Sequence, residues 1–583
     1  MPESPMLAGF VSNMIGYEAV CANQCPWKLP YFLGCGNGVS RSTAAHMAVQ
    51  DHLVHLTLMG CVLLHDRQPG TSDGQDGAHD REHTAQCGGD LLGDTGLDIS
   101  VLYNISPFHP LHDYPGPLLW KATRLTASYH HATGDLYKCI AVIHDEYGRA
   151  VRIAPDEVSF SSPSAFPAIY NARPQLGKSP WHFGPANEIK LPDGNSLPES
   201  LITAPDAEHT RLRKLITPAF LNAGIAEVEP VLQKYTDLLC KQLAVASKAG
   251  SQNMVEWLLW TLNDVIGQLA LDQEFQCLEL RRMHPWPKFL LSVLKQTAFL
   301  NQFRRFGFSF KLLTMLAPQK LLDERDEFMN VVYRAVNQRL AREKGQASDI
   351  GYGNDQKSRP DLVGLMLRDM RGTDRLSEPE VISNSILIIG GGAETTSTCL
   401  SATLYHLCKA PHAMQRLKDE IRGCFSTNEE ITITAISDLP YLKAVIDESL
   451  RIFPVASYIT PRVIPEEGHI IDGHFLPGGT HVPMGQFFMG RSGQFFDDPR
   501  EFRPERWLEG NEVQKVSGMR VNEILKPFSM GPRNCIGKQL ALTEARLVTA
   551  KLIWHFDMEL DGLHQSWVQD ARYYGYFSRC ASS

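Results

Sequence analysis

The sequence Phe528-Ser529-Met530-Gly531-Pro532-Arg533-Asn534-Cys535-Ile536-Gly537 holds one cysteine in a setting that suits a metal ligand. Glycines bracket the cysteine, and glycine allows both a sharp backbone turn and the close approach of a large flat group. Arg533 adds a permanent positive charge and a forked donor that matches a carboxylate. The residues alone leave two interpretations of Cys535: a metal ligand, or a buried free thiol in a turn.

A helix is predicted directly after this loop, because residues 538–547 are rich in strong helix formers and place Leu540 and Leu547 at helical spacing. The N-terminus of a helix lowers the pKa of a nearby thiol. We therefore expect Cys535 to favour its anionic form.

The pattern Phe-x-x-Gly-x-Arg-x-Cys-x-Gly resembles the haem-ligand loop of the cytochromes P450, and each of its fixed positions is present. The resemblance implies a mainly α fold with a small β region, and haem (heme b) as the cofactor. It makes Cys535 the axial ligand of the iron, Arg533 a partner of a haem propionate and Phe528 a packing shield for the sulfur, with Gly537 closing the loop. A thiolate ligand pushes electron density to the iron and favours cleavage of the oxygen–oxygen bond.

The glycine-rich segment Ile386-Leu387-Ile388-Ile389-Gly390-Gly391-Gly392-Ala393-Glu394-Thr395 gives the second signal. Three glycines after an aliphatic run predict either the end of a helix, or a continuous helix whose backbone leaves room for a cofactor and a small ligand. The segment resembles the oxygen-activation motif of P450s. Splitting dioxygen requires protons in a dry site, and Thr395 backed by the Glu394 carboxylate is suited to relay them.

A Glu-x-x-Arg pair, Glu448 and Arg451, lies on one face of a predicted helix and is ordinarily a surface contact. In P450s this pair is buried and joins an arginine of a later segment, which is present here as Arg506. Buried charges are tolerated when they are mutually paired, so we expect these three residues to determine the fold.

Three further residues resemble haem-propionate partners. His209 and Arg213 occupy the places of the family's Trp-x-x-x-Arg motif, with histidine replacing tryptophan, on a helix for which Asp206 is the predicted cap. A solvated basic face is the alternative for these two. Arg462 lies in a predicted strand, residues 459–463, whose arginine reaches a propionate in the family.

Composition narrows the class of protein. The chain has 583 residues, 43% hydrophobic content and a formal charge of −9, which is ordinary for a globular protein and argues against nucleic acid as a partner. Its 13 cysteines are scattered without a disulfide framework, which suits a reducing compartment. Since no nucleotide-binding fingerprint is apparent, we expect electrons to come from NADPH through a separate cytochrome P450 reductase.

The first hundred residues differ from the rest. Residues 66–97 are rich in Gly, Asp, His and Gln, and the longest apolar run, residues 53–64, is shorter than the roughly 20 residues of a spanning helix. We predict a poorly structured extension over residues 1–100 and a P450 domain over residues 101–583. Proline-rich residues 107–117 predict a stiff, extended connection. The resemblance implies the cytosolic face of the endoplasmic reticulum membrane, and the sequence leaves open peripheral attachment or a cytoplasmic location.

The favoured function is monooxygenation, in which one atom of O2 enters a small lipophilic substrate. The segments around Tyr103 and residues 107–117 resemble P450s of filamentous-fungal secondary metabolism, which implies a polyketide, terpenoid or alkaloid intermediate as substrate. The alternatives are a P450-type isomerase or dehydratase that does not use O2, and a non-catalytic haem-binding protein. Retention of Glu394 and Thr395 favours the monooxygenase.

Overall fold

The computed structural model describes residues 95–180, 191, 193–289, 291–292, 319–343, 361–368, 375–508, 515–516, 519–562, 566–575 and 577–578. Its fold is mainly helical with a small β region, as the sequence predicts. The predicted extension lies almost wholly outside the described residues, and the predicted boundary at residue 100 falls inside a helix, α3.

The helices of the described residues are α3 Thr95–Ile105, α4 Leu118–Ala122, α5 Leu125–Ala132, α6 Leu136–Tyr147, α7 Ala165–Tyr170, α8 Asp206–Ile216, α9 Asn222–Ala246, α10 Met254–Leu271, α11 Cys277–Leu280, α14 Gln319–Glu343, α15 Leu362–Arg368, α16 Glu378–Lys409, α17 Pro411–Cys424, α18 Ile433–Ser437, α19 Pro440–Ile452, α20 Gln486–Gly490, α21 Val521–Ile524, α22 Lys538–His555 and α23 Trp567–Asp570. The strands are β1 Ala150–Ala154, β2 Glu157–Phe160, β3 Gly177–Lys178, β4 Ile459–Val463, β5 His469–Ile471, β6 His474–Leu476, β7 His481–Met484, β8 Lys515–Val516, β9 Met519–Arg520, β10 Arg572–Tyr573 and β11 Phe577–Ser578.

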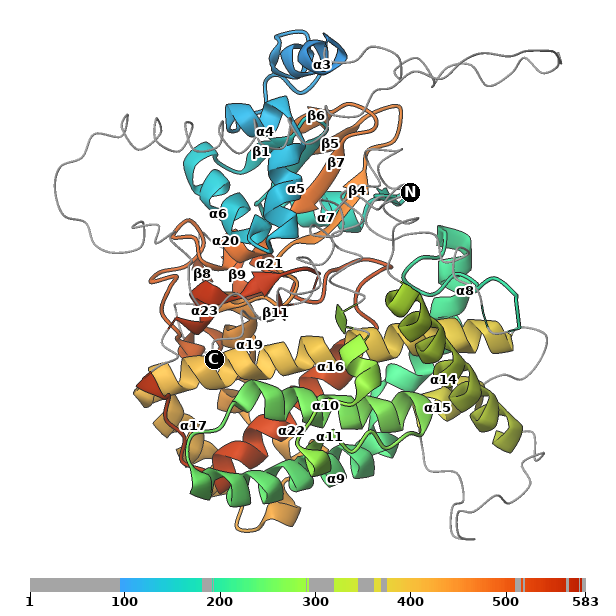
Figure 1. The fold of residues 1–583 in the computed structure, drawn as a ribbon. Coiled ribbons are helices and arrows are strands. Elements are labelled where there is room, and N and C mark those ends of the chain that lie inside the picture. The colour runs from blue at the N-terminus through green and yellow to red at the C-terminus, as the bar shows by residue number, and fades with distance from the viewer. Residues whose placement is uncertain are drawn as a thin grey trace, which may run out of the picture. The chain divides into compact units, whose positions relative to one another are not determined.

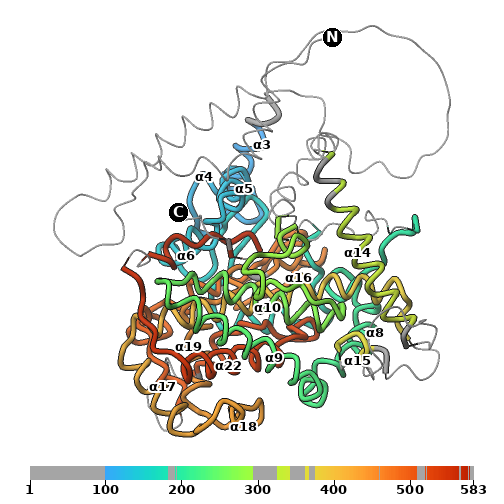
Figure 2. The backbone as a smooth tube through the Cα atoms, turned by 60° about the horizontal axis from the view of Figure 1, so that its bottom comes forward, coloured from blue at the N-terminus to red at the C-terminus, as the bar shows by residue number. Residues whose placement is uncertain are grey.

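A group of long helices forms the larger part of the fold (Figure 1). Helix α10 packs along α16, and α22 packs against both α16 and α9. Figure 2 shows the same helices side by side from a second direction. Their shared core is almost entirely aliphatic and aromatic, and the predicted helical pair Leu540 and Leu547 is part of it. This packing fixes α22, whose first residue follows the cysteine loop.

The smaller part of the fold contains a five-stranded sheet with the order β1-β2-β7-β4-β3. The predicted pair of short strands is confirmed as the antiparallel ladder of β1 and β2. Strand β4 pairs antiparallel with β7 on one side and with β3 on the other, where Lys178 lies opposite Arg462. The sheet therefore brings together residues almost 300 positions apart in the chain.

Helix α16 continues through the three glycines, so the prediction of a helix end there is wrong and that of a continuous helix is confirmed. Its start is fixed by a capping box, in which the Ser377 hydroxyl accepts from the Glu380 backbone N–H and the Glu380 carboxylate accepts from the Ser377 N–H. Neighbouring helices then pack along much of its 32-residue length. Packing of this extent outweighs the cost of about 1 kcal/mol for each glycine.

The Glu448 cluster, which we define as Glu448, Arg451 and Arg506, is buried as predicted, with all three side chains no more than 1% exposed. The Glu448 carboxylate accepts two hydrogen bonds from Arg451, at 2.7 and 2.8 Å, and one from Arg506 Nε at 3.3 Å. It also accepts from the Arg503 backbone N–H and the Trp507 indole. Through these hydrogen bonds, the cluster connects α19 to the segment at residues 503–507.

The proline-rich residues 107–117 differ from their prediction. They form a series of turns, closed by backbone hydrogen bonds from His109 to Ser106, from His112 to His109 and from Tyr114 to Leu111. Residues 115–117 have no regular secondary structure, and of these Pro117 has an extended backbone conformation. Proline fixes its own φ but is compatible with turns, and the non-proline residues between the prolines supply the N–H donors that close them.

Among the described helices, none by itself combines the length and apolar character of a membrane span; one bent pair, covering residues 206–220 and 222–249, meets both criteria jointly. The apolar run at residues 53–64 lies outside the described residues.

Candidate haem site

The cysteine loop is a tight turn held by its own backbone. The Cys535 N–H donates to the Phe528 carbonyl at 2.9 Å, and the Asn534 N–H donates to the Gly531 carbonyl at 3.1 Å. Gly531 has a φ of 74°, and a Cβ at this position would lie 2.1 Å from the Tyr170 carbonyl oxygen. Only glycine therefore fits at position 531. The predicted helix after the loop is confirmed as α22, with Gly537 in the N-cap position.

Cys535 is exposed, whereas Cys240, Cys277 and Cys399 are buried free thiols. The surrounding protein nevertheless raises the pKa of Cys535, because desolvation outweighs the backbone N–H of Gly537 and the positive charge of Arg213, which lower it. The prediction that the helix start makes the thiol anionic is thus wrong for the protein alone. A metal ion bound to this exposed sulfur would supply the charge that stabilises the thiolate.

Gly391 is also exposed, although it lies in the middle of α16, and a Cβ there would meet no atom within 4 Å. Space beside this helix backbone is what the glycine-rich motif predicts. By contrast, a Cβ on the next residue, Gly392, would lie 2.7 Å from the Ile266 side chain, so this glycine serves the packing of α16 on α10.

The four predicted haem-propionate partners, which are His209, Arg213, Arg462 and Arg533, lie near one another in the fold. His209 is buried, and burial together with the charges of Arg533, Lys178 and Arg213 lowers its pKa to about 4, so its ring is neutral near pH 7. The Arg213 guanidinium donates to the carbonyl and the side-chain oxygen of Asn534, beside Cys535, at 2.6 and 2.7 Å. These contacts join α8 to the cysteine loop.

The predicted cap of α8 is wrong. Pro205 occupies the N-cap position and Asp206 is the first helical residue, without a capping bond. The Asp206 carboxylate instead accepts from Arg533 Nη2 at 2.6 Å, and the same nitrogen donates to the Ala204 carbonyl. An arginine more than 300 residues away therefore competes successfully for the carboxylate that could have capped the helix.

Two guanidinium nitrogens in this region are buried without a hydrogen-bond partner among the described residues. They are Nη1 of Arg462 and Nη1 of Arg533. A buried guanidinium donor without an acceptor is costly, and bidentate carboxylates are its preferred partners. The Arg462 side chain is otherwise stacked near Tyr170, with 5.5 Å between the guanidinium carbon and the ring centroid.

Lys178 is a member of the same cluster that sequence reasoning missed. Burial, Arg533 and Arg462 lower its pKa to about 7. No local signal marks this residue, because it is one basic residue in a short segment before β3. Its position became evident only from the pairing of β3 with β4.

Glu394 and Thr395, the acid and the alcohol of the oxygen-activation motif, form hydrogen bonds with different partners. The Thr395 hydroxyl donates to the Gly391 carbonyl at 2.6 Å, within α16. The buried Glu394 carboxylate accepts from the Thr398 hydroxyl at 2.9 Å and from the backbone N–H of Phe577 at 3.1 Å. The C-terminal hairpin of β10 and β11 is therefore bonded to the motif, which the sequence did not predict.

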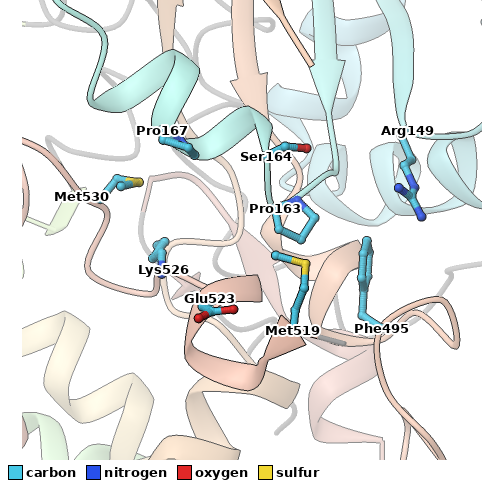
Figure 3. Close-up of a pocket in the computed structure, with 9 residues that line it drawn as sticks. All are labelled: Arg149, Pro163, Ser164, Pro167, Phe495, Met519, Glu523, Lys526 and Met530. Atoms are coloured by element: carbon cyan, nitrogen blue, oxygen red, sulfur yellow. The ribbon is translucent and has the colours of Figure 1, made fainter. Parts of the chain in front are cut away.

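A pocket of about 490 Å³ adjoins the cysteine loop at Met530 (Figure 3). It is lined by apolar side chains, including Phe495 and Met519, and by the polar side chains of Arg149, Ser164, Glu523 and Lys526. None of the predicted haem-site residues lines it, so it is separate from the candidate haem site.

The described residues fit haem. The propionates of a haem would supply acceptors for Nη1 of Arg462 and Nη1 of Arg533, which have none among the described residues, and Cys535 would hold its iron.

The cytochrome P450 family model matches residues 113–574, and the chain belongs to this family. The chain is 37% identical to averantin hydroxylase of Dothistroma septosporum, over 79% of this chain and 83% of the relative. It is 36% identical to the cytochrome P450 monooxygenase cpaH of Aspergillus oryzae, over 84% and 91%, and 36% identical to the cytochrome P450 monooxygenase stcF of Emericella nidulans, over 79% and 92%. The predicted fold and the monooxygenase class are thereby confirmed; the isomerase and the non-catalytic alternatives gain no support.

Proposed function

We propose that this monooxygenase hydroxylates a small lipophilic intermediate of fungal secondary metabolism, with Cys535 as the haem ligand. The observation that carries the site assignment is the combination of an accessible but desolvated thiol with buried arginine donors that have no acceptor among the described residues. Two relatives are named averantin hydroxylase, which supports hydroxylation as the reaction. A polyketide, terpenoid or alkaloid skeleton remains the proposed substrate class.

Haem with a thiolate ligand supplies the oxygen chemistry when it is bound. The chain supplies the rest. Arg462, Arg533, Arg213 and His209 bind the propionates, and the Phe528 ring and the loop backbone shield the sulfur. The Thr395 hydroxyl holds a proton for delivery beside Gly391. The Glu394 carboxylate is the proposed source of that proton, and water is the proposed link between the two, because the hydrogen bonds described for Glu394 lead to Thr398 and Phe577.

Electrons would come from NADPH through a cytochrome P450 reductase. Lys538 is exposed beside the cysteine loop, with its amine 5.9 Å from the Phe528 ring centroid, and is the stronger candidate for the docking face. Lys526 is half-buried and lines the pocket of Figure 3, and burial lowers its pKa. By family resemblance we place the enzyme at the cytosolic face of the endoplasmic reticulum membrane.

The first test is the visible difference spectrum of the reduced protein with carbon monoxide. The wild-type protein should give the long-wavelength band of a thiolate-ligated haem, and Cys535→Ala should lose it. Cys424→Ala is the matched control, because Cys424 is an exposed thiol on α17. A long-wavelength band that survives in Cys535→Ala would refute the ligand assignment.

The proton relay is tested separately with Thr395→Ala. This variant should keep haem and the long-wavelength band but divert electrons to peroxide, because it lacks the hydroxyl that holds the proton. Thr395→Ser retains the hydroxyl and should restore coupling of NADPH oxidation to oxygen insertion. Normal coupling in Thr395→Ala would exclude the relay role.

A further inference from the structure

The C-terminal hairpin of β10 and β11 is bonded to two other elements through its backbone. Tyr573 and Phe577 are directly opposite each other in its antiparallel pair. The Tyr573 N–H donates to the Gly134 carbonyl at 2.9 Å, and the Phe577 N–H donates to Glu394 Oε1 at 3.1 Å. In an antiparallel ladder, alternate opposed pairs direct their N–H groups away from the partner strand. The hairpin therefore directs one N–H to the turn before α6 and the other to the oxygen-activation motif.

Buried aromatic side chains hold Phe577 in this place. Its ring centroid lies 4.5 Å from that of Phe453, directly after α19, and 5.6 Å from that of Tyr137 on α6. Phe453 is 0% exposed and Tyr137 is 2% exposed, and both share a core with side chains of α16. Because the same core contacts the hairpin and α16, the Phe577 N–H has a fixed position beside that helix.

The Glu394 carboxylate is held at one oxygen by two elements. The Thr398 hydroxyl, one turn further along α16, donates to Oε1 at 2.9 Å, and the Phe577 N–H donates to the same atom. Thr398 can orient the carboxylate only relative to its own helix. The hairpin adds an anchor outside α16, and two donors on one oxygen determine how the carboxylate group is turned.

The orientation of this carboxylate matters for proton delivery, because neighbouring residues of a helix do not face each other. Glu394 and Thr395 are such neighbours, and the Thr395 hydroxyl is bonded to the Gly391 carbonyl. A water molecule that links the two groups therefore requires a carboxylate in a fixed place, since a small misplacement of a catalytic group can cost about a hundredfold in rate.

We propose that Phe577 is a positioning residue for oxygen activation, whose backbone N–H holds the Glu394 carboxylate in the orientation that supplies Thr395 with protons. This inference rests on the proposed function, because it requires Glu394 to be the proton source. The hairpin acts through its backbone, so the N–H at position 577 matters more than the side chain. Proline is the residue that lacks this N–H.

The contact is tested by amide hydrogen exchange of the holoenzyme at Phe577, which does not depend on activity. Glu394→Leu removes the acceptor, so this amide should exchange about tenfold to a hundredfold faster than in the wild-type protein, as expected for loss of a hydrogen bond to a charged group. Thr398→Val is the matched control: it removes the other donor but keeps the carboxylate, so Phe577 should stay protected. Equal exchange in Glu394→Leu and the wild type would overturn the proposal.

The role in proton delivery is tested with NADPH, reductase and O2 alone, from the hydrogen peroxide formed per NADPH oxidised. Two electrons and two protons reduce O2 to peroxide, whereas four electrons and four protons reduce it to two water molecules. The ratio of peroxide to NADPH therefore rises toward one when protons are delivered poorly. Phe577→Pro should form about tenfold less water than Phe577→Leu, which keeps the N–H.

Proline can also perturb the hairpin itself, so the same two substitutions are repeated in Glu394→Gln. There they should give equal ratios, because the carboxylate that the N–H positions is absent. A difference as large as in the wild-type background would overturn the proposal. If Glu394→Gln raises the ratio but Phe577→Pro matches Phe577→Leu, the Phe577 proposal fails while the proposed relay stands. If Glu394→Gln has the wild-type ratio, the proposed relay itself fails.

Discussion

The fold contains two buried groups of arginine side chains, and they differ in how their charges are balanced. In the Glu448 cluster, one carboxylate accepts from both Arg451 and Arg506, and Arg451 also donates to the carbonyls of Pro499 and Glu501. In the second cluster, formed by Arg462 and Arg533, each arginine keeps a buried nitrogen without a partner among the described residues, as Arg506 does in the first, but no carboxylate among the described residues is bonded to Arg462.

This difference separates a structural charge cluster from a ligand-binding one. Burying a charge is tolerated when the charge is paired, and Glu448 provides one carboxylate that Arg451 and Arg506 share. Arg462 is bonded to no carboxylate among the described residues, and the partner that we propose for it is a haem propionate. Removing a residue should consequently affect folding in the first cluster and cofactor retention in the second.

The largest effect is expected for Glu448→Gln. Breaking a buried ion pair on one side costs about 3–5 kcal/mol, so the free energy of unfolding should fall by that amount. Urea unfolding followed by circular dichroism measures it. Asp447→Asn is the control, because the neighbouring Asp447 forms an i,i+4 pair with the exposed Lys443. Equal stability of Glu448→Gln and the wild-type protein would contradict a structural role for the cluster.

The next effect is expected for Arg462→Met. It should lower haem affinity about tenfold to a hundredfold, since it removes a charged donor from the proposed propionate site. Helical content, measured by circular dichroism, should stay near that of the wild type. Arg325→Met, which changes an exposed arginine on α14, should keep wild-type haem content. A fall in the free energy of unfolding as large as that of Glu448→Gln would remove the distinction between the clusters.

A smaller effect, which depends on pH, is expected for Glu544 on α22. Unlike the two arginine clusters, this site is a single buried carboxyl group. Burial raises its pKa to about 8, and the hydrogen bond with Thr396 opposes this only in part. The folded state therefore binds a proton that the unfolded state releases above pH 4.5. Stability should fall as pH rises from 4.5 to 8, with a slope of at most about 1.4 kcal/mol per pH unit, and level off above pH 8.

Glu544→Gln should remove this part of the pH dependence. The difference in unfolding free energy between the variant and the wild type, measured from pH 5 to pH 9, isolates Glu544 from the other titrating groups. A difference that does not change with pH would show that Glu544 is not protonated in the folded protein.

The smallest effect is expected for Asp447→Asn, the control named above. Its pair with Lys443 is partly exposed, so the loss should be no more than about 0.5 kcal/mol. Thermal unfolding measures this loss of stability. A loss greater than about 0.5 kcal/mol would mean that the geometry of an ion pair contributes more to stability than its burial does.

The sequence alone predicted the features that depend on residues close together in the chain. The cysteine loop, the helix after it and the Glu448–Arg451 spacing are local patterns, and each is present in the structure. Recognition of the family then predicted Arg506, because the family's contact pattern already contains the distant partner.

The sequence alone did not predict features in which contacts between distant parts of the chain replace local ones. Asp206 resembles a helix cap but is bonded to Arg533, and the Glu394 carboxylate accepts from the C-terminal hairpin. The pKa of Cys535 is raised because desolvation by the folded protein exceeds the local effect of the helix start. Lys178 has no local pattern at all, since its neighbours are set by strand pairing.

Strand β3 has only two residues and joins the sheet through β4 alone. An edge this short has few hydrogen bonds of its own, and Arg462 lies in the strand that it pairs with. On the proposed assignment, a propionate bound to Arg462 would make this edge of the sheet more stable when the cofactor is present. Amide hydrogen exchange at residues 177–178 and 462–463 would then distinguish protein molecules with bound cofactor from those without it.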